Sequence, residues 1–507
     1  MTRPGRLFEV LCLLILTAAG FGLRAAEIDL FGLSPDDGNY LHSAGVTHML
    51  VDADLDWTEQ DENWFERTKT YRHSYVHQYA IRWFKRAGAD NVSAVRLGSV
   101  ILGSLTPLIL FLLLAGKDDK RRRLALLSAV MLAGYSMHVW LSRTGWGQPG
   151  CTFFFVVYLL FADRLFHQAK GRGLGRTSFY AAGMMLAALG AYGYHEMIVV
   201  HVAGMGLYSV LHLLWNRGKP GERDRARAFI AFGLSCIPVT LWASTLLSDS
   251  FAQEHWSGLV QEAYGKNYFD YRLLVLKTMF KSYGLHEQVG WIVIALSVPG
   301  MVFMRRRDQA LFRFLFTTFM MSWAVFFFAF RDPYLVRIYL PTFILLIVFA
   351  AEGMLGFADR FALERRGLAR VVIASIVVFL WAQSAVTLFV RSDTPLTVAS
   401  FYTPLKQPHR RPLKPISDYL HTHRQSGEVL GINGDFSPFF SLQDEGHSGQ
   451  HHNGAAWEKP LAEQPTWIVG GQRQMKSEGH ALEAGGNFEF IVADTTGRLA
   501  LYRVRRP

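Results

Sequence analysis

The stretch FGLSPDDGNY (residues 31–40) follows the first long apolar run of the chain. It places two carboxylates, Asp36 and Asp37, side by side where a membrane-spanning helix would leave the bilayer. Two adjacent carboxylates at this depth are unfavourable unless they serve a site or cap a helix. Because SPDD is also a good helix start signal, both interpretations stay open at this point.

The composition around this stretch is typical of a membrane protein. Of the 507 residues, 50% are hydrophobic and 18% are charged, whereas a soluble protein carries about 25% charged residues. The charges are also segregated, which indicates several membrane-crossing segments. The net charge of +11 therefore reflects basic loops that set the topology, and it does not indicate a nucleic-acid partner.

Eleven apolar runs approach the length of about 20 residues that a membrane-crossing helix needs. They cover residues 8–26, 93–115, 124–141, 151–167, 178–194, 197–215, 228–248, 289–304, 311–330, 334–356 and 370–390. We therefore predict an all-α polytopic membrane protein with about eleven transmembrane helices. The first run could instead be a cleaved signal peptide, because LRAAE (23–27) permits cleavage.

Basic residues mark every second loop and so orient the chain. Arg3 and Arg6 precede the first run. The other clusters are KDDKRRR (117–123), KGRGLGR (170–176), NRGKPGERDRAR (216–227), RRRD (305–308) and DRFALERRGLAR (359–370). The positive-inside rule predicts that these loops and the N-terminus are cytoplasmic and that the C-terminus is outside.

The chain divides by composition into a membrane part and an external tail. We predict a transmembrane domain at residues 1–390 with a long external loop at 27–92, a linker at 391–415, and an extracytoplasmic α/β domain at 416–507. In the tail, ISDYLHTHR is predicted to be a helix, and EVLGING, TWIVGG, FEFIVAD and LALYRV are predicted to be strands. The histidine-containing stretch GHSGQHHNG (446–454) is expected to be a loop, either solvated or metal-binding.

Other ionisable side chains lie at the outer ends of the spans, on the same side as Asp36 and Asp37. These are His73, His77, Arg96, Arg143, His195, Glu196, His286, Glu287, Arg331 and Arg337. Each could simply anchor a helix end, yet ionisable groups at membrane depth are functional candidates. Together they predict an external cavity for an anionic substrate with a lipid tail. A general base and a phosphate clamp are what sugar transfer from a lipid-linked phosphosugar requires.

The order of the motifs resembles the GT-C superfamily of membrane glycosyltransferases. It is most similar to the protein O-mannosyltransferase-like family (glycosyltransferase family 39) and to the lipid A aminoarabinose transferases. The pattern D-E-x-x-Y followed by a small residue is matched by DDGNY (36–40) and Ala44, with Asp in place of Glu. The H-P-P-L segment is matched by His73 without the prolines, and a later G…R-L-x-S pattern by Gly88 and RLGS (96–99).

Two further motifs extend the resemblance to about residue 390. The S-R-x-G segment appears as SRTG (142–145), and the P-x-x-x-R segment appears as PYLVR (333–337). Many relatives carry another acidic residue shortly after S-R, where this chain has GQP (147–149). The resemblance therefore leaves the metal open: a divalent ion such as Mg or Mn, if one binds, would use Asp36 and Asp37.

The resemblance implies a fold, a reaction and roles for residues. The fold would be a transmembrane helix bundle with amphipathic helices in the first external loop, and transfer would proceed with inversion. The donor would be a polyprenyl-phosphate sugar, and the acceptor a lipid, a glycan or a protein. Asp36 would deprotonate the acceptor hydroxyl, and Asp37 would orient it or bind a metal.

The cations and neighbouring side chains would bind the donor. Arg143 and Arg337 would hold the departing phosphate, and His195 and Glu196 would line the headgroup site. The remaining substrate-binding candidates are Arg96, His73 and Tyr40. The expected location is a bacterial plasma (inner) membrane, where lipids surround the chain.

Two alternatives remain. A lipid or glycan transporter or flippase would use the same cavity without breaking a bond, and it would need polar residues within the spans. The spans look largely free of them, with Glu352 as an exception, which favours the enzyme. A catalytically inactive scaffold with a binding tail is the third interpretation, and the intact acidic pair argues against it.

Overall fold

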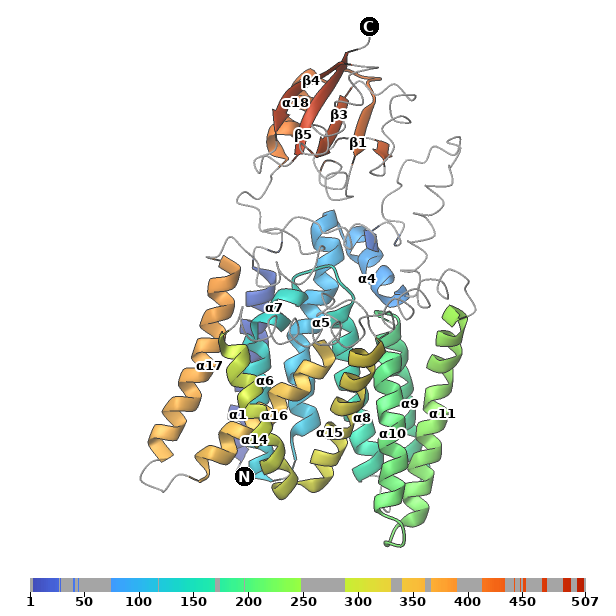
Figure 1. The fold of residues 1–507 in the computed structure, drawn as a ribbon, viewed down its shortest axis with the longest axis vertical. Coiled ribbons are helices and arrows are strands. Elements are labelled where there is room, and N and C mark those ends of the chain that lie inside the picture. The colour runs from blue at the N-terminus through green and yellow to red at the C-terminus, as the bar shows by residue number, and fades with distance from the viewer. Residues whose placement is uncertain are drawn as a thin grey trace, which may run out of the picture.

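A computed structural model of the chain describes residues 3–26, 28, 40–41, 44, 74–116, 118–168, 174–195, 197–247, 288–329, 340–360, 366–389, 413–433, 442, 447, 450–452, 467–471, 487–493 and 499–505. Long helices form a bundle, and a small sheet lies beyond the end of the bundle opposite the N-terminus (Figure 1). We refer to the end of the bundle nearest the sheet as the upper end.

Each predicted apolar run falls on a helix. The helices are α1 (Arg3–Ala25), α5 (Asn91–Leu114), α6 (Asp119–Gly134), α7 (Ser136–Ser142), α8 (Gln148–Gln168), α9 (Leu174–Tyr192), α10 (Ile198–Trp215), α11 (Glu222–Leu247), α14 (Gln288–Arg307), α15 (Gln309–Ala329), α16 (Leu340–Ala358) and α17 (Arg366–Phe389). In the described part, six are long and apolar enough to cross a membrane, or seven if the bent pair α6 and α7 counts as one span. The polytopic helical fold is confirmed, and the total of eleven spans stays a prediction.

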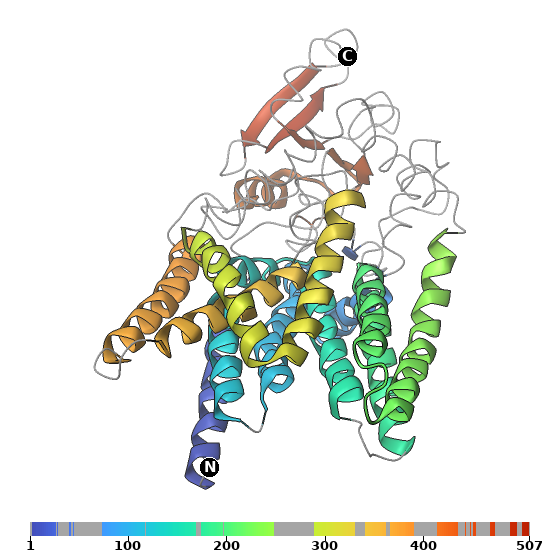
Figure 2. The same cartoon turned by 60° about the horizontal axis from the view of Figure 1, so that its bottom comes forward.

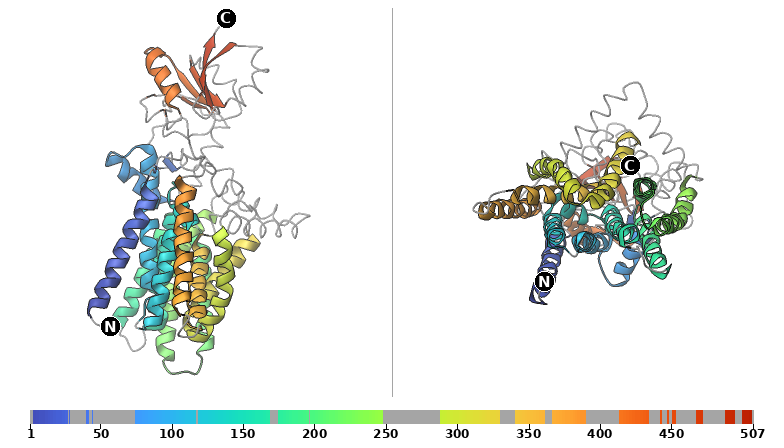
Figure 3. Two further views of the ribbon diagram at one scale, coloured as in Figure 1. Left: turned by 90° about the vertical axis from the view of Figure 1, so that its left-hand side faces the viewer. Right: turned by 90° about the horizontal axis from the view of Figure 1, so that it is seen from below.

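Helix α5 lies in the middle of the bundle. It packs against α1, α6 and α8, and the short helix α4 (Tyr75–Arg86) packs against it at the upper end (Figure 1). Figures 2 and 3 show α17 at one edge of the bundle and α11 at the opposite edge. The residues that face lipid in such a bundle are exposed and apolar, as on α11 and α17.

The run predicted at 124–141 is not one straight helix. The chain breaks at Tyr135, whose backbone is extended, and α6 and α7 differ in direction by 57°. Side chains from other helices replace the missing helical partners: Arg24 Nη1 donates to the Ala133 carbonyl (3.1 Å), and Ser384 Oγ donates to the Gly134 carbonyl (2.5 Å). The apolar pattern could not reveal this break, because the groups that stabilise it come from α1 and α17.

Ion pairs gather at the lower end of the bundle, which carries the loops predicted to be cytoplasmic. Glu352, the exception among the apolar spans, is buried and pairs with Arg307 at 2.6 Å. Arg121 also pairs with Asp308 at 2.5 Å. Glu352 therefore joins α14 to α16 as a structural residue.

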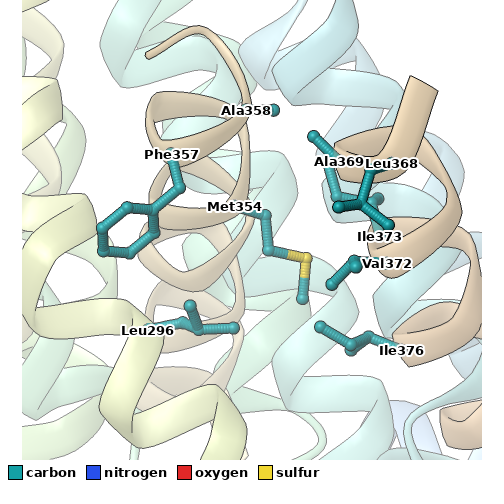
Figure 4. A pocket seen from close by; sticks show the side chains of 9 residues that line it. All are labelled: Leu296, Met354, Phe357, Ala358, Leu368, Ala369, Val372, Ile373 and Ile376. Atoms are coloured by element: carbon teal, nitrogen blue, oxygen red, sulfur yellow. The ribbon is translucent and has the colours of Figure 1, made fainter. Parts of the chain in front are cut away.

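Helices α16 and α17 leave an apolar groove of about 170 Å³ near the same end (Figure 4). Met354 and Phe357 line it from α16, and Val372 and Ile373 line it from α17. Leu368 beside it is 63% exposed. Since the groove has only apolar walls and opens beside exposed apolar side chains, it belongs to the lipid-facing surface.

The residues after 413 form one helix and a mixed sheet. Helix α18 (Lys414–His423) precedes β1 (Leu430–Asn433), β2 (Gln450–His452), β3 (Trp467–Gly471), β4 (Asn487–Ala493) and β5 (Leu499–Arg505). The strand order is β2-β1-β3-β5-β4, with β1 parallel to β2 and β3, and β5 antiparallel to β3 and β4. The predicted helix and four strands are present, and the domain boundaries remain a prediction.

The histidine stretch differs from the predicted loop. Residues 450–452 form β2, and His447 is buried, with its Nε2 3.0 Å from Ser417 Oγ of α18. The Gly and Ser content of this stretch indicated a turn. Pairing with β1 instead makes part of the stretch a strand of the sheet. Within the described part of the chain, no three His, Cys, Asp or Glu side chains gather as metal ligands.

Glycines allow α14 and α16 to touch along their backbones. A Cβ on Gly300 would lie 1.7 Å from the Phe349 carbonyl oxygen, and a Cβ on Gly353 would lie 2.2 Å from the Leu296 carbonyl oxygen. Neither position can accept a methyl group unless the two helices move apart.

We therefore expect Gly300→Ala to destabilise the bundle by about 1–3 kcal/mol, the usual effect of overpacking. Gly233→Ala is the matched control, because no atom lies within 4 Å of the place that a Cβ would occupy on this glycine of α11, and we expect a change of less than about 1 kcal/mol. The unfolding midpoint in detergent measures both. Equal midpoints for the two variants would show that α14 and α16 do not pack this closely.

Candidate functional site

Four segments that carry the sequence motifs or lie next to them meet at the upper end of the bundle. They are Tyr40, the start of α4, the stretch 143–147 after α7, and the turn 193–195 between α9 and α10. The N–H groups of Val76 and His77 donate to the Gly193 carbonyl at 2.9 and 3.2 Å. Ser74 Oγ donates to the Tyr194 carbonyl at 3.0 Å. The first turn of α4 is thereby held against the α9–α10 turn.

Small residues make this close contact possible. A Cβ on Gly147 would lie 2.2 Å from the Tyr194 carbonyl oxygen and 3.3 Å from the Tyr40 hydroxyl. A Cβ on Gly150 would lie 2.2 Å from the Tyr194 ring. The backbone after S-R-x-G thus lies directly against both tyrosines, in a space that a larger side chain would fill.

His77 lies where these segments join. Its side chain is fully buried, and Nε2 lies 2.7 Å from the Gly145 carbonyl oxygen. Since a carbonyl only accepts, Nε2 carries the proton. The Tyr40 ring meets the imidazole edge-on, with centroids 4.7 Å apart and planes at 84°, and the Tyr194 ring lies at 5.3 Å. Burial lowers the pKa of His77 to about 4, although the hydrogen bond to Gly145 opposes that shift, so the imidazole is neutral at neutral pH.

Arginines hold the end of α1, from which the chain leads toward the acidic pair. Arg143 is buried, and its Nη1 donates to the carbonyls of Leu23 (3.1 Å), Arg24 (3.3 Å) and Ala26. Arg96 is also buried and donates from Nη1 to the Ile28 carbonyl at 2.8 Å. The last carbonyls of a helix carry partial negative charge and have no intrahelical partner, so a guanidinium suits them.

A further arginine, Arg24, was not among the residues predicted from the sequence. It is fully buried near the end of α1, donates to the Gly20 carbonyl (2.9 Å), and places Nη2 2.7 Å from Nδ1 of His138 in α7. The available signal was a basic residue at the outer end of a span, against the positive-inside rule. It lies in LRAAE, a stretch that also suits signal-peptide cleavage, which concealed it.

The described site candidates all lie in this region. Tyr40 contacts His77, and Arg96 and Arg143 hold the end of α1. His195 accepts a hydrogen bond at Nδ1 from the Met197 N–H (3.3 Å), next to the start of α10. The remaining candidates lie outside the described residues: Asp36, Asp37, His73, Glu196, His286, Glu287, Arg331 and Arg337.

The structure adds His77 to the candidates, whereas His73 lies outside the described residues. Both histidines lie in RHSYVHQY (72–79), but the partial match to H-P-P-L favoured His73. His77 is the one seen to contact Gly145 of the S-R-x-G segment and Tyr40 of the acidic segment. The helical spacing of the sequence could have indicated that His77 is buried, because His77, Gln78 and Ile81 form the buried face of α4.

The expectation that the spans carry few polar groups is wrong. Asp163 of α8 is buried and accepts from His167 Nδ1 (2.9 Å), whose Nε2 lies 2.9 Å from the Tyr208 hydroxyl of α10. His201 of α10 lies 2.7 Å from Ser322 Oγ of α15. Apolar residues surround these polar groups in each run, so averaged hydropathy conceals them.

Comparison with protein families supports the resemblance drawn from the motifs. A family model described as dolichyl-phosphate-mannose-protein mannosyltransferase matches residues 48–247. This range includes α4 and the S-R-x-G segment. A comparison with curated proteins gives no significant match.

Solved structures share the fold at low sequence identity. ArnT from Cupriavidus metallidurans bound to undecaprenyl phosphate matches with a TM-score of 0.58 and 14% identity, over 98% of this chain and 97% of that chain. The archaeal oligosaccharyltransferase AglB from Archaeoglobus fulgidus, in complex with an inhibitory peptide and a dolichol-phosphate, matches with a TM-score of 0.51 and 11% identity, over 99% and 75%. The arabinofuranosyltransferase AftD from Mycobacteria matches with a TM-score of 0.52 and 14% identity, over 98% and 40%.

All three neighbours are GT-C glycosyltransferases, and the motif order of this chain resembles the same superfamily. The chain is thus a multi-pass membrane protein with the GT-C glycosyltransferase fold, and its residues 48–247 match the protein mannosyltransferase family of that superfamily.

Proposed function

We propose that this chain moves a sugar from a polyprenyl-phosphate donor to an acceptor hydroxyl on the extracytoplasmic side of a bacterial plasma membrane, with inversion. The observation that carries the proposal is the junction at the upper end of the bundle. There, α4, the S-R-x-G stretch and the residues on both sides of the acidic pair are held together by His77, Arg96 and Arg143. The lipid phosphates named with ArnT and AglB support a lipid-linked donor.

In the proposed reaction, Asp36 accepts the proton of the acceptor hydroxyl. The hydroxyl oxygen attacks the anomeric carbon, and the bond from that carbon to the phosphate oxygen breaks. The bonding electrons leave with the polyprenyl phosphate, and attack from the opposite face inverts the anomeric carbon. Asp37 orients the acceptor, and a divalent metal held by the pair would supply the same orientation together with positive charge.

Arg143 and Arg337 are proposed to stabilise the charge that develops on the leaving phosphate. The guanidinium of Arg143 has five N–H donors, and Nη1 already binds the carbonyls at the end of α1. Arg143 would thus fix the position from which the acidic segment starts and face the phosphate with the same planar group. His195 and Glu196, on the turn before α10, are proposed to line the donor headgroup site with Arg96, His73 and Tyr40.

The transporter alternative also has an observation in its favour. Asp163, His167 and Tyr208 form a hydrogen-bonded chain between α8 and α10, and ionisable groups within the spans are what a transporter would need. A transporter would move the intact lipid-linked sugar and release no polyprenyl phosphate. The enzyme is preferred because the junction gathers Ile28 and Tyr40, which flank the acidic pair in the sequence, and the S-R-x-G stretch at one end of the bundle.

The role proposed for the acidic pair can be tested by substitution. Asp36→Asn should lower sugar transfer at least roughly 100-fold, because the amide cannot accept the hydroxyl proton, and Asp37→Asn should cause a smaller loss. The measurement is transfer from labelled polyprenyl-phosphate sugars to a cell-envelope extract, in membranes with equal amounts of each variant. Asp54→Asn, in the same external loop, is the matched control.

Equal transfer by wild type and Asp36→Asn would show that the pair only caps a helix. Movement of intact donor across the membrane without release of polyprenyl phosphate would instead favour the transporter.

Arg143→Lys should lower kcat by roughly 100-fold. Lysine keeps the positive charge, but it presents its N–H donors from one point and cannot bind the α1 carbonyls and a phosphate together. Arg164→Lys is the matched control, because Arg164 donates to the Leu112 carbonyl (3.0 Å) near the end of α5, away from the junction. If both variants keep wild-type kcat, the phosphate role of Arg143 is wrong.

The orientation has its own test. Alkaline phosphatase forms its disulfides only outside the cytoplasm, so a fusion at the C-terminus should be active and a fusion after residue 172 should be inactive. The second fusion lies in the basic loop between α8 and α9. The reverse pattern of activities would place the junction on the cytoplasmic side and overturn the proposed sidedness.

A further inference from the structure

His77 of α4 contacts two partners from distant parts of the chain. Its Nε2–H donates to the Gly145 carbonyl of the S-R-x-G stretch at 2.7 Å. The imidazole also meets the edge of the Tyr40 ring, with the two ring centroids 4.7 Å apart. The sequence positions of these partners differ by about a hundred residues, so no local backbone geometry brings them together.

A second residue of α4 holds the same short segment. Arg82 Nε donates to the Ala44 carbonyl, and the Ala44 N–H donates to the Tyr40 carbonyl at 2.9 Å. His77 and Arg82 therefore fix both ends of residues 40–44 on α4. This segment follows the acidic pair closely, because only residues 38–39 separate Asp37 from Tyr40.

The hydrogen bond also settles the chemical form of the imidazole. Because the carbonyl holds the Nε2 proton and the ring is neutral, Nδ1 has a lone pair and no proton. Nδ1 is buried and has no hydrogen-bond partner among the described residues. Among the described residues, the imidazole thus donates one hydrogen bond and packs against the rings of Tyr40 and Tyr194, which suits a group that holds two segments at a fixed distance.

We propose that His77 is a positioning residue of the transfer site, which sets the distance between Tyr40, the last residue of the acidic segment, and Gly145 of the S-R-x-G segment. The inference rests on the proposed function, because it assigns the base to the first segment and the phosphate clamp to the second. The imidazole touches neither reacting group in this role. It acts by holding Tyr40 on one side and Gly145 on the other.

Two matched variants distinguish the hydrogen bond that Nε2 donates to Gly145 from the lone pair on Nδ1. In His77→Gln, the side-chain amide nitrogen takes the place of Nε2 and can still donate to the Gly145 carbonyl, while the Nδ1 lone pair is lost. In His77→Asn, the amide lies near the place of Nδ1 and cannot reach that carbonyl. His77→Ala removes both contacts.

The measurement is kcat and donor KM of purified full-length protein in lipid nanodiscs, at a temperature well below the unfolding midpoint of every variant. We expect His77→Ala and His77→Asn to lower kcat by roughly 100-fold with a smaller change in KM, since misplacing groups by about 1 Å has that effect. His77→Gln should recover most of this loss, to within roughly tenfold of wild type. Recovery by Asn and not by Gln would assign the function to Nδ1 and overturn the positioning role, as would wild-type kcat in the Ala variant.

The contact itself is tested without activity. His77→Ala and Tyr40→Ala, singly and together, should shift the unfolding midpoint non-additively, because the two rings touch. Additive shifts would show that His77 does not hold Tyr40 and would overturn the inference. If the wild type transfers no sugar while the shifts are non-additive, the proposed function has failed and the contact stands.

Discussion

The upper end of this bundle depends on guanidinium groups that satisfy backbone carbonyls. Where a helix ends or breaks at membrane depth, its last carbonyls lose their partners, and little water is present to replace them. Arg143 binds the carbonyls that end α1, Arg96 binds the Ile28 carbonyl beyond it, and Arg24 binds Ala133 at the α6–α7 break. The same three side chains join α1, α5, α6 and the stretch after α7.

These three arginines have two structural roles. They stabilise irregular backbone, and they fix where the chain leaves α1 toward Asp36 and Asp37. Glycines complete the junction, since Gly147 and Gly150 let the stretch after S-R-x-G lie against Tyr40 and Tyr194. The motifs mark Arg143 only as a candidate for binding the phosphate. It is therefore also part of the scaffold that would position the proposed base, Asp36.

Much of the fold could be predicted from the sequence. Apolar runs of sufficient length marked every long helix of the described bundle, because a bilayer demands both length and apolarity from each span. Short runs rich in apolar and β-branched residues marked β1, β3, β4 and β5. For the site, the order of short motifs placed Tyr40, Arg96, Arg143 and His195 at one end of the bundle, where the structure brings them together.

The sequence by itself thus determined the class of fold, the positions of the long helices in the described bundle and the end at which the motifs collect, because these follow from local composition and from chain order. Only the tertiary structure decided that His77 joins Tyr40 to Gly145, that α6 breaks before α7, and that the Asp163–His167 pair of α8 reaches Tyr208 of α10. Each of these depends on partners from distant parts of the chain. A hydrogen bond between such partners leaves no periodic signal in either segment, so packing alone reveals it.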